Sequence, residues 1–200
     1  DIVASGSQKG YMIPPGLSFI SVSDKAWKAI ELLNLPKFYL DLKSYKKSLL
    51  NNSNPYTPSV NLMFALDEAL KMMREEGLDN IFLRHNKHKL AMSNAAKALN
   101  LKLFADEKYL SPSITAIKTD GMDAEEFRKT IKDNFDILLA GGQDHLKGKI
   151  FRVGHLGYVN DRDIIAVVSA ISNTLLGQGK ITAQQAGEAL VVVSKYLDGN

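Results

Sequence analysis

Lys9 is the first residue whose type and setting could do chemistry. It lies in a turn at residues 6–10 that is rich in glycine and serine and directly follows an apolar stretch, so its amine would be held close to the body of the protein. A lysine desolvated in this way has a lowered pKa, and its neutral amine can attack a carbonyl group to form a Schiff base. The alternative is a solvated loop lysine, because lysine and arginine together account for 25 of the 200 residues.

Arg152 is the second candidate. It stands between Phe151 and Val153 in a predicted strand, where a charged side chain needs a partner. A guanidinium group is planar and can donate two parallel hydrogen bonds to a carboxylate. The position is therefore compatible with a carboxylate-binding residue, and an exposed or ion-paired strand arginine is the alternative.

Tyr56 and Thr57 directly precede a predicted helix. Because the free backbone N–H groups and the dipole at a helix N-terminus attract phosphate, these residues are candidate phosphate ligands. An ordinary turn in the sequence Pro-Tyr-Thr-Pro is the alternative. A glycine turn at residues 141–145 could also cradle a phosphate, but a mobile loop near a substrate entrance is the simpler interpretation.

His85 and His88 are three residues apart on a predicted helix, a spacing close to that of metal ligands. Their neighbours Arg84, Lys87 and Lys89 favour a solvated helix face instead. We therefore predict no metal site.

These residues must be positioned by alternating strands and helices, which hydrophobic periodicity and turn residues indicate along the chain. The predicted strands are residues 1–5, 17–22, 101–104, 113–118, 136–140 and 149–153. The predicted helices are residues 25–33, 61–76, 78–99, 124–134, 160–176 and a last helix that begins after Thr182. The first strand is expected to be buried, and residues 36–58 are expected to be irregular. The chain is therefore predicted to be an α/β protein.

The composition is that of a globular protein, with 45% hydrophobic and 24% charged residues and a net charge of +3. The basic residues are dispersed, so no nucleic-acid partner is expected. No apolar stretch reaches the ~20 residues that a membrane span needs, so no membrane partner is expected either. The chain has no cysteine. This excludes disulfides, thiolate-bound zinc and iron–sulfur clusters within it and is compatible with a cytoplasmic protein.

Three longer stretches carry a resemblance to a known family: SGSQKGYMIPPGL at residues 5–17, NPYTPSVNL at residues 54–62 and FRVGHLG at residues 151–157. In this order they resemble the class V, fold-type I aminotransferases that use pyridoxal phosphate, in the alanine–glyoxylate and serine–glyoxylate aminotransferase group. The resemblance extends over essentially the entire chain and is closest to cyanobacterial-type members, some of which carry the label of a soluble hydrogenase subunit. The absence of cysteine argues against hydrogenase chemistry and against the cysteine desulfurases of the same fold class.

The resemblance implies roles for five residues. Lys9 would hold pyridoxal 5′-phosphate as a Schiff base and then move a proton between the substrate Cα and the cofactor C4′. Gln8 would contact the cofactor phosphate, although it could instead stabilise the turn. Tyr56 and Thr57 would contact the phosphate bound to the neighbouring subunit of a homodimer. Arg152 would bind the α-carboxylate of amino-acid and 2-oxo-acid substrates.

The resemblance also implies a domain organisation. Residues 1–80 would be the C-terminal portion of the large cofactor-binding domain, and residues 81–200 would be the small C-terminal α/β domain. In the family, the acid for the pyridine nitrogen, the stacking aromatic residue and the glycine-rich phosphate turn precede the lysine. The chain is therefore expected to be the C-terminal portion of a subunit roughly twice as long. Its start without methionine, at Asp1 within a predicted strand, agrees with this expectation.

The activity implied by the resemblance is transfer of an amino group from alanine or serine to glyoxylate by a ping-pong mechanism. A complementary N-terminal half would be supplied by another chain or by a nicked subunit. The alternative is a non-catalytic folded fragment or interaction module without bound cofactor.

Overall fold

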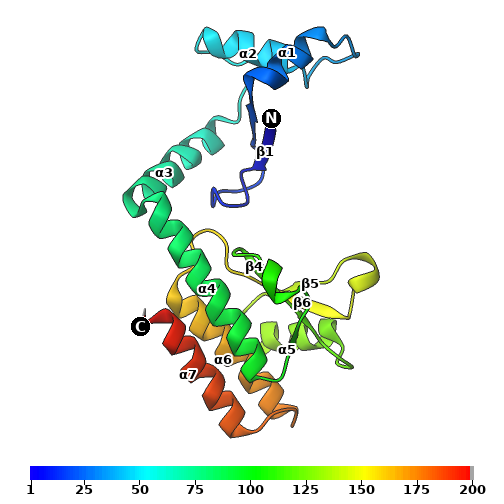
Figure 1. The fold of residues 1–200 in the computed structure, drawn as a ribbon, viewed down its shortest axis with the longest axis vertical. Helices are drawn as coiled ribbons and strands as arrows, with labels where there is room; N and C mark the ends of the chain where they lie inside the picture. Colours follow the sequence, from blue (N-terminus) through cyan, green and yellow to red (C-terminus); the bar gives the residue numbers. More distant parts are fainter. Residues whose placement is uncertain (199–200) are drawn as a thin grey trace. The chain divides into compact units, whose positions relative to one another are not determined.

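The computed structural model describes residues 1–198 and divides into two compact units. The first unit is Asp1–Glu75, and the second begins at Glu76. Figure 1 traces the elements along the chain, from the blue strand β1 to the red helix α7. Each unit has its own sheet and its own helices.

The first unit combines a two-stranded antiparallel sheet with three helices. Its elements are β1 (Ile2–Gly6), β2 (Ser18–Val22), α1 (Asp24–Leu32), α2 (Leu42–Leu50) and α3 (Val60–Glu76). Apolar and β-branched side chains favour the two strands, and Gly6 pairs with Ser18 where the ladder ends. The strands therefore form a hairpin whose loop, residues 7–17, contains Lys9.

Two expectations for this unit are wrong. β1 is exposed rather than buried, with 54% of Ile2 and 66% of Val3 accessible, because β2 is its sole partner strand within residues 1–198. Residues 36–58 are not irregular throughout, since α2 lies in the middle of them. Asp41 caps this helix by accepting a hydrogen bond from the Lys43 N–H. The surrounding asparagine, serine and proline residues obscure this start signal in the sequence.

The second unit consists of a four-stranded antiparallel sheet and four α-helices, joined by short 3₁₀ helices. Its strands are β3 (Lys102–Leu103), β4 (Ile114–Lys118), β5 (Ala140–Gly141) and β6 (Ile150–Gly154), in the order β3-β4-β6-β5. Its helices are α4 (Leu78–Ala98), η1 (Glu107–Tyr109), α5 (Ala124–Phe135), η2 (Asp144–Leu146), α6 (Asp161–Gly177) and α7 (Ala183–Leu197). None of the helices in residues 1–198 combines the length and the apolar character that crossing a bilayer requires.

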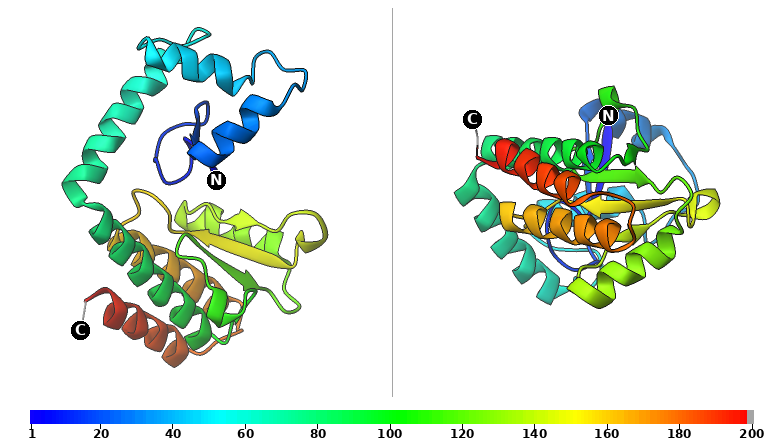
Figure 2. Two further views of the ribbon diagram at one scale, coloured as in Figure 1. Left: turned by 45° about the horizontal axis from the view of Figure 1, so that its top comes forward. Right: turned by 90° about the horizontal axis from the view of Figure 1, so that it is seen from below.

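The core of the second unit fixes the strand that carries Arg152. Helices α4, α6 and α7 lie side by side (Figure 2), and α5 packs against β5 and β6. The rings of Phe127 on α5 and Phe151 on β6 are fully buried, with centroids 5.1 Å apart. Val153 is also buried. Because side chains alternate along a strand, Arg152 points to the face opposite these two core residues.

Most predicted elements of the second unit are confirmed, and so is the mixed α/β fold class. Gly77 separates α3 from α4 with a φ of 82°, a conformation that glycine adopts without strain. The expected strand at residues 136–140 is shorter than predicted, because the ladder contains only Ala140 and Gly141 there. Asp136 instead adopts the left-handed conformation, with a φ of 54°, at the end of α5.

Candidate active site

The loop that carries Lys9 is closed by Ser7. This serine is buried, and its hydroxyl group donates to the Pro14 carbonyl at 2.8 Å and accepts from the Leu17 N–H at 3.1 Å. The Ser7 N–H donates to the Leu17 carbonyl at 3.0 Å. These bonds tie the two ends of the loop together. Sequence reasoning missed this role, for which the signal was a small polar residue at the point where the strand gives way to the turn.

Lys9 lies on the exposed part of this loop, whereas the sequence predicted an amine held close to the body of the protein. Its carbonyl accepts from the Met12 N–H at 3.0 Å, and its side chain forms no ion pair within residues 1–198. Gln8 folds back over the turn, with Oε1 2.9 Å from where a Cβ on Gly6 would stand. An accessible amine on an anchored backbone fits covalent attachment of an aldehyde cofactor.

Replacing Ser7 with alanine is expected to loosen this loop. The change removes both hydrogen bonds of the buried hydroxyl, which costs about 1–3 kcal/mol when a partner is left unsatisfied. Hydrogen exchange of the Leu17 amide should accelerate about tenfold or more. Ser5→Ala, at an exposed position of β1, is the matched control and should leave that amide unchanged. Equal protection of Leu17 in both variants would contradict the role of Ser7.

Tyr56 lies in an aromatic cluster. Its ring centroid is 4.6 Å from that of Tyr39 and 6.0 Å from that of Phe38, and its hydroxyl group donates to the Phe38 carbonyl at 3.1 Å. Thr57 follows in the same loop, shortly before α3 begins. Residues 52–58 line an open surface hollow of about 700 Å³. The Tyr56 hydroxyl hydrogen is therefore already engaged, which leaves Thr57 as the better hydrogen-bond donor of the two.

The guanidinium group of Arg152 is anchored along one edge. Its Nε donates to the Gly141 carbonyl at 2.8 Å, and the side chain is half-buried. Nη1 and Nη2 form no hydrogen bond or ion pair within the part of the chain that the structure describes. The two terminal nitrogens are thus available to an acceptor with two oxygens, such as a carboxylate. The glycine turn at residues 141–145 begins in the sheet, since Gly141 belongs to β5.

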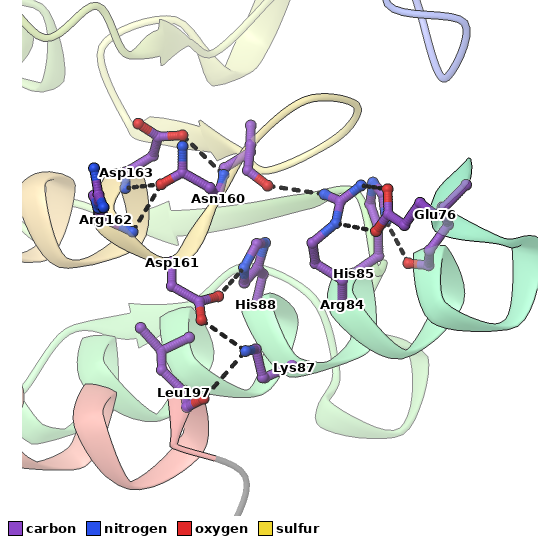
Figure 3. A network of polar contacts seen from close by, with 12 residues as sticks. Glu76, Arg84, His85, Lys87, His88, Asn160, Asp161, Arg162, Asp163 and Leu197 are labelled. Carbon is purple, nitrogen blue, oxygen red and sulfur yellow. Dashed lines mark hydrogen bonds and ion pairs between the residues drawn. The ribbon is translucent and has the colours of Figure 1, made fainter. Parts of the chain in front are cut away.

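The segment after β6 is held by the first turns of α4 (Figure 3). Arg84 Nη1 donates to the carbonyls of Gly157 at 2.9 Å and Val159 at 2.8 Å. His85 Nδ1 donates to the Ile81 carbonyl at 2.7 Å, which leaves Nε2 to accept a hydrogen bond from the Gly157 N–H at 3.1 Å. The last residue of the FRVGHLG stretch is therefore fixed through both its N–H and its carbonyl group.

Glu76 in turn holds Arg84 through both carboxylate oxygens (Figure 3). The Oε1–Nε distance is 2.6 Å and the Oε2–Nη2 distance is 2.9 Å. The hydrogen bond between the two groups lowers the pKa of Glu76 and raises that of Arg84. Arg84 therefore binds a carboxylate through Nε and Nη2 and two carbonyl groups through Nη1. It is a structural residue that joins the start of α4 to the segment after β6.

His88 lies deeper along α4 and is completely buried. Its Nε2 donates to Asp161 Oδ1 at 2.8 Å, and Lys87 donates to Asp161 Oδ2 at 2.8 Å. Burial lowers the pKa of His88, opposed by the bond to Asp161. Burial acts to raise the pKa of Asp161, but the bonds from Lys87 and His88 lower it overall.

The solvated helix face expected for the histidines of α4 is therefore wrong. His85 is 8% exposed and His88 is 0% exposed, and their neighbours Arg84 and Lys87 donate to acceptors on segments that pack against α4. The prediction of no metal site rested on this solvated face and stays a prediction. Within residues 1–198, no group of three or more histidine, cysteine, aspartate or glutamate side chains could hold a metal ion.

His155 lies within the FRVGHLG stretch and is completely buried. Its Nδ1 donates to the Pro112 carbonyl at 3.0 Å, so its Nε2 accepts from the Thr115 hydroxyl at 2.9 Å. Burial lowers the pKa of His155 to about 4. The imidazole is therefore neutral near pH 7, and its two hydrogen bonds hold the end of β6 against β4 and the segment before it.

Because His155 is buried in its neutral form, we expect the second unit to lose stability in mild acid. The pKa of His155 is about 4 in the folded state, below the usual value of 6.5, so the unfolded state binds more protons between these values. Lowering the pH from 7.5 to 5 should reduce the free energy of unfolding by about 2 kcal/mol through His155. The lowered pKa of His88 acts in the same direction. Hydrogen exchange of the β6 amides, corrected for intrinsic rates, measures this change. Equal protection at the two pH values would contradict it.

The residues singled out in the sequence fall into three places. Gln8 and Lys9 share the hairpin loop, Tyr56 and Thr57 share the loop before α3, and both loops belong to the first unit. No hydrogen bond or ion pair joins these two loops within residues 1–198. Arg152 belongs to the second unit, where Gly141 anchors its side chain.

The chain is similar to known proteins along most or all of its length. It is 58% identical over 179 residues to the soluble hydrogenase 42 kDa subunit of Anabaena cylindrica, which covers 90% of this chain and 47% of that protein. It is 35% identical over 208 residues to the serine–glyoxylate aminotransferase of Methylorubrum extorquens, which covers 100% of this chain and 51% of that protein. No family model matches the chain.

A solved structure extends this similarity to the fold. Pyridoxamine–pyruvate aminotransferase from Mesorhizobium loti matches 99% of this chain and 52% of its own, with a TM-score of 0.92 and 27% identity. The chain spans about half the length of the curated relatives it matches. It therefore belongs to the alanine–glyoxylate and serine–glyoxylate aminotransferase group of class V, fold type I, and corresponds to the C-terminal portion of such a subunit.

Proposed function

We propose that this chain is the lysine-bearing part of a pyridoxal 5′-phosphate-dependent aminotransferase that moves an amino group from alanine or serine to glyoxylate or a related 2-oxo acid. The observation that carries the proposal is the geometry of Arg152. Its Nε is anchored on the Gly141 carbonyl, and its two terminal nitrogens are available for a substrate carboxylate. The similarity to a serine–glyoxylate aminotransferase supports the substrate class.

The roles of the residues follow from their settings. When bound, pyridoxal phosphate supplies the electron sink for chemistry at the amino carbon. Lys9 holds the cofactor covalently and moves a proton between the substrate Cα and the cofactor C4′. Ser7 keeps the loop of Lys9 closed. Gln8 contacts the cofactor phosphate from the same loop, a role that requires its side chain to leave the position over Gly6.

Thr57 and Tyr56 contact the phosphate bound to the neighbouring subunit of a homodimer. Their exposed loop supports this assignment, because residues 52–58 line a surface hollow rather than the core of the unit. The Thr57 hydroxyl is the donor, since the Tyr56 hydroxyl already donates to the Phe38 carbonyl. Tyr56 then orients the loop through its aromatic neighbours.

Residues 1–80 belong to a large cofactor-binding domain, and residues 81–200 form the small domain of this cytoplasmic enzyme. The division of the structure between Glu75 and Glu76 supports this organisation. A complementary N-terminal half covers the first unit. Support for this partner comes from the large apolar side chains that the first unit exposes: Ile2, Val3, Phe38, Leu40 and Phe64. Exposed apolar surface of this extent marks a contact with other protein.

Steady-state kinetics of the protein that contains this chain tests the proposal. With alanine or serine as donor and glyoxylate as acceptor, double-reciprocal plots should give parallel lines, because each donor leaves its amino group on the enzyme before the acceptor binds. Absence of amino transfer to any 2-oxo acid, with pyridoxal phosphate supplied in excess, would contradict it. A colourless protein that binds no cofactor would instead support a non-catalytic fragment or interaction module.

A further inference from the structure

A short segment of the second unit, residues 139–141, is held between two arginine side chains. Arg128, on α5, donates from Nε to the Leu139 carbonyl at 2.7 Å. Arg152, on β6, donates from Nε to the Gly141 carbonyl at 2.8 Å. The segment includes β5, which pairs with β6 so that Ala140 lies opposite Arg152. The carbonyl that anchors Arg152 therefore belongs to a segment that Arg128 holds from the other side.

Arg128 is itself fixed in place. Its Nη1 donates to Glu125 Oε2 at 2.7 Å, and its side chain is only 21% exposed. A Cβ on Gly141 would stand 2.5 Å from Arg128 Nη1 and 2.7 Å from Glu125 Oε1. The ion pair thus packs directly against the Gly141 backbone, and a side chain at this position would displace it. This contact ties the position of the Gly141 carbonyl to the Glu125–Arg128 pair.

The hydrogen bond to the Gly141 carbonyl determines which edge of the Arg152 guanidinium group can bind a carboxylate. A guanidinium group can donate hydrogen bonds to two carboxylate oxygens in two ways. It uses either Nε and one terminal nitrogen or both terminal nitrogens. The bond from Nε to the Gly141 carbonyl occupies the first of these edges. The remaining edge, Nη1 with Nη2, is the one left for a substrate.

We propose that Arg128 is a positioning residue for the substrate carboxylate. It holds the segment whose Gly141 carbonyl sets the rotation of Arg152, so that the substrate is bound end-on through Nη1 and Nη2. This inference rests on the proposed function, in which Arg152 binds the α-carboxylate. It adds that Glu125 and Arg128, which make no substrate contact in this scheme, determine how well carboxylate-bearing substrates bind.

The test compares Arg128→Met with Lys129→Met in the cofactor-loaded enzyme that contains this chain. Lys129 is the exposed neighbour of Arg128 on α5 and serves as the matched control. Arg128→Met should raise the KM for alanine and for glyoxylate about tenfold, the effect of weakening one hydrogen bond to a charged group, while kcat changes less than about twofold. Lys129→Met should change neither constant.

A second readout separates positioning from general structural damage. Ethylamine is alanine without its carboxylate, and its slow half-reaction is followed by the absorbance of the bound cofactor. Arg128→Met should leave this rate unchanged while it slows the half-reaction with alanine about tenfold. Equal loss with both amines would overturn the inference. Gly141→Ala displaces the same ion pair and should likewise slow the half-reaction with alanine but not the one with ethylamine. This variant replaces Arg128→Met in the test if Arg128→Met does not fold.

Arg152→Lys distinguishes failure of this inference from failure of the proposed function. If Arg152→Lys leaves the KM for alanine unchanged, the carboxylate-binding role of Arg152 is wrong, and the role of Arg128 is wrong with it. If Arg152→Lys raises that KM but Arg128→Met and Gly141→Ala, like the control Lys129→Met, leave it unchanged, only the positioning role of Arg128 is overturned.

Discussion

Replacing Lys9 with alanine is expected to reduce transamination by about a thousandfold or more in the enzyme that contains this chain. The change removes the amine that holds the cofactor and the group that moves a proton at the substrate Cα, and such acid–base groups contribute about 10²–10⁴-fold. The loop itself should be retained, because Ser7 closes it through bonds that do not involve the Lys9 side chain. The measurement is kcat at saturating alanine and glyoxylate.

The control for this prediction is Lys28→Ala, which removes an exposed lysine from α1 of the same unit. Its kcat should equal that of the unmodified enzyme. Added methylamine should restore part of the activity of Lys9→Ala, because a free amine can replace the missing proton carrier. Full activity in Lys9→Ala, or equal loss in the two variants, would rule out the assigned role of Lys9.

Replacing Arg152 with lysine should raise the KM for both the amino acid and the 2-oxo acid by about 10- to 100-fold. Lysine keeps the positive charge but loses the planar fork, so it cannot donate to the Gly141 carbonyl and to two carboxylate oxygens in the same arrangement. Both substrates are affected because both carry the carboxylate next to the reacting carbon. Steady-state kinetics with each substrate varied in turn gives the two KM values.

Lys147→Ala is the control for this variant, since it removes an exposed positive charge from the connection between β5 and β6. It should leave both KM values unchanged. The absorbance of the bound cofactor should be the same in Arg152→Lys as in the unmodified enzyme, because Arg152 acts on the substrate rather than on the cofactor. Unchanged KM values in Arg152→Lys would contradict the carboxylate-binding role.

Local sequence patterns were sufficient to predict the elements that carry these two residues. The strand before Lys9 and the strand around Arg152 both follow from short apolar runs next to turn residues, and the structure contains both. The position of Arg152 opposite the core also follows, because the flanking Phe151 and Val153 are apolar and side chains alternate along a strand. The roles of the two residues came from the resemblance and not from these patterns.

Contacts between residues far apart in the sequence could not be predicted in the same way. The basic residues beside His85 and His88 indicated a solvated face, but the acceptors that allow this face to be buried lie on α6 and on the segment after β6. The bond from Arg152 to the Gly141 carbonyl likewise depends on how β5 pairs with β6. Side-chain charge alone does not distinguish a solvated group from one with a distant partner.

We propose that this chain provides the lysine that holds pyridoxal phosphate, and one measurement tests this role of Lys9 most directly. The protein that contains this chain is purified, reduced with borohydride and digested, and its peptides are analysed by mass spectrometry. We predict a reduced pyridoxal phosphate adduct on Lys9, and loss of that adduct when excess alanine is added before the reduction. An adduct on another lysine, or no adduct in a protein supplied with the cofactor, would contradict the claim.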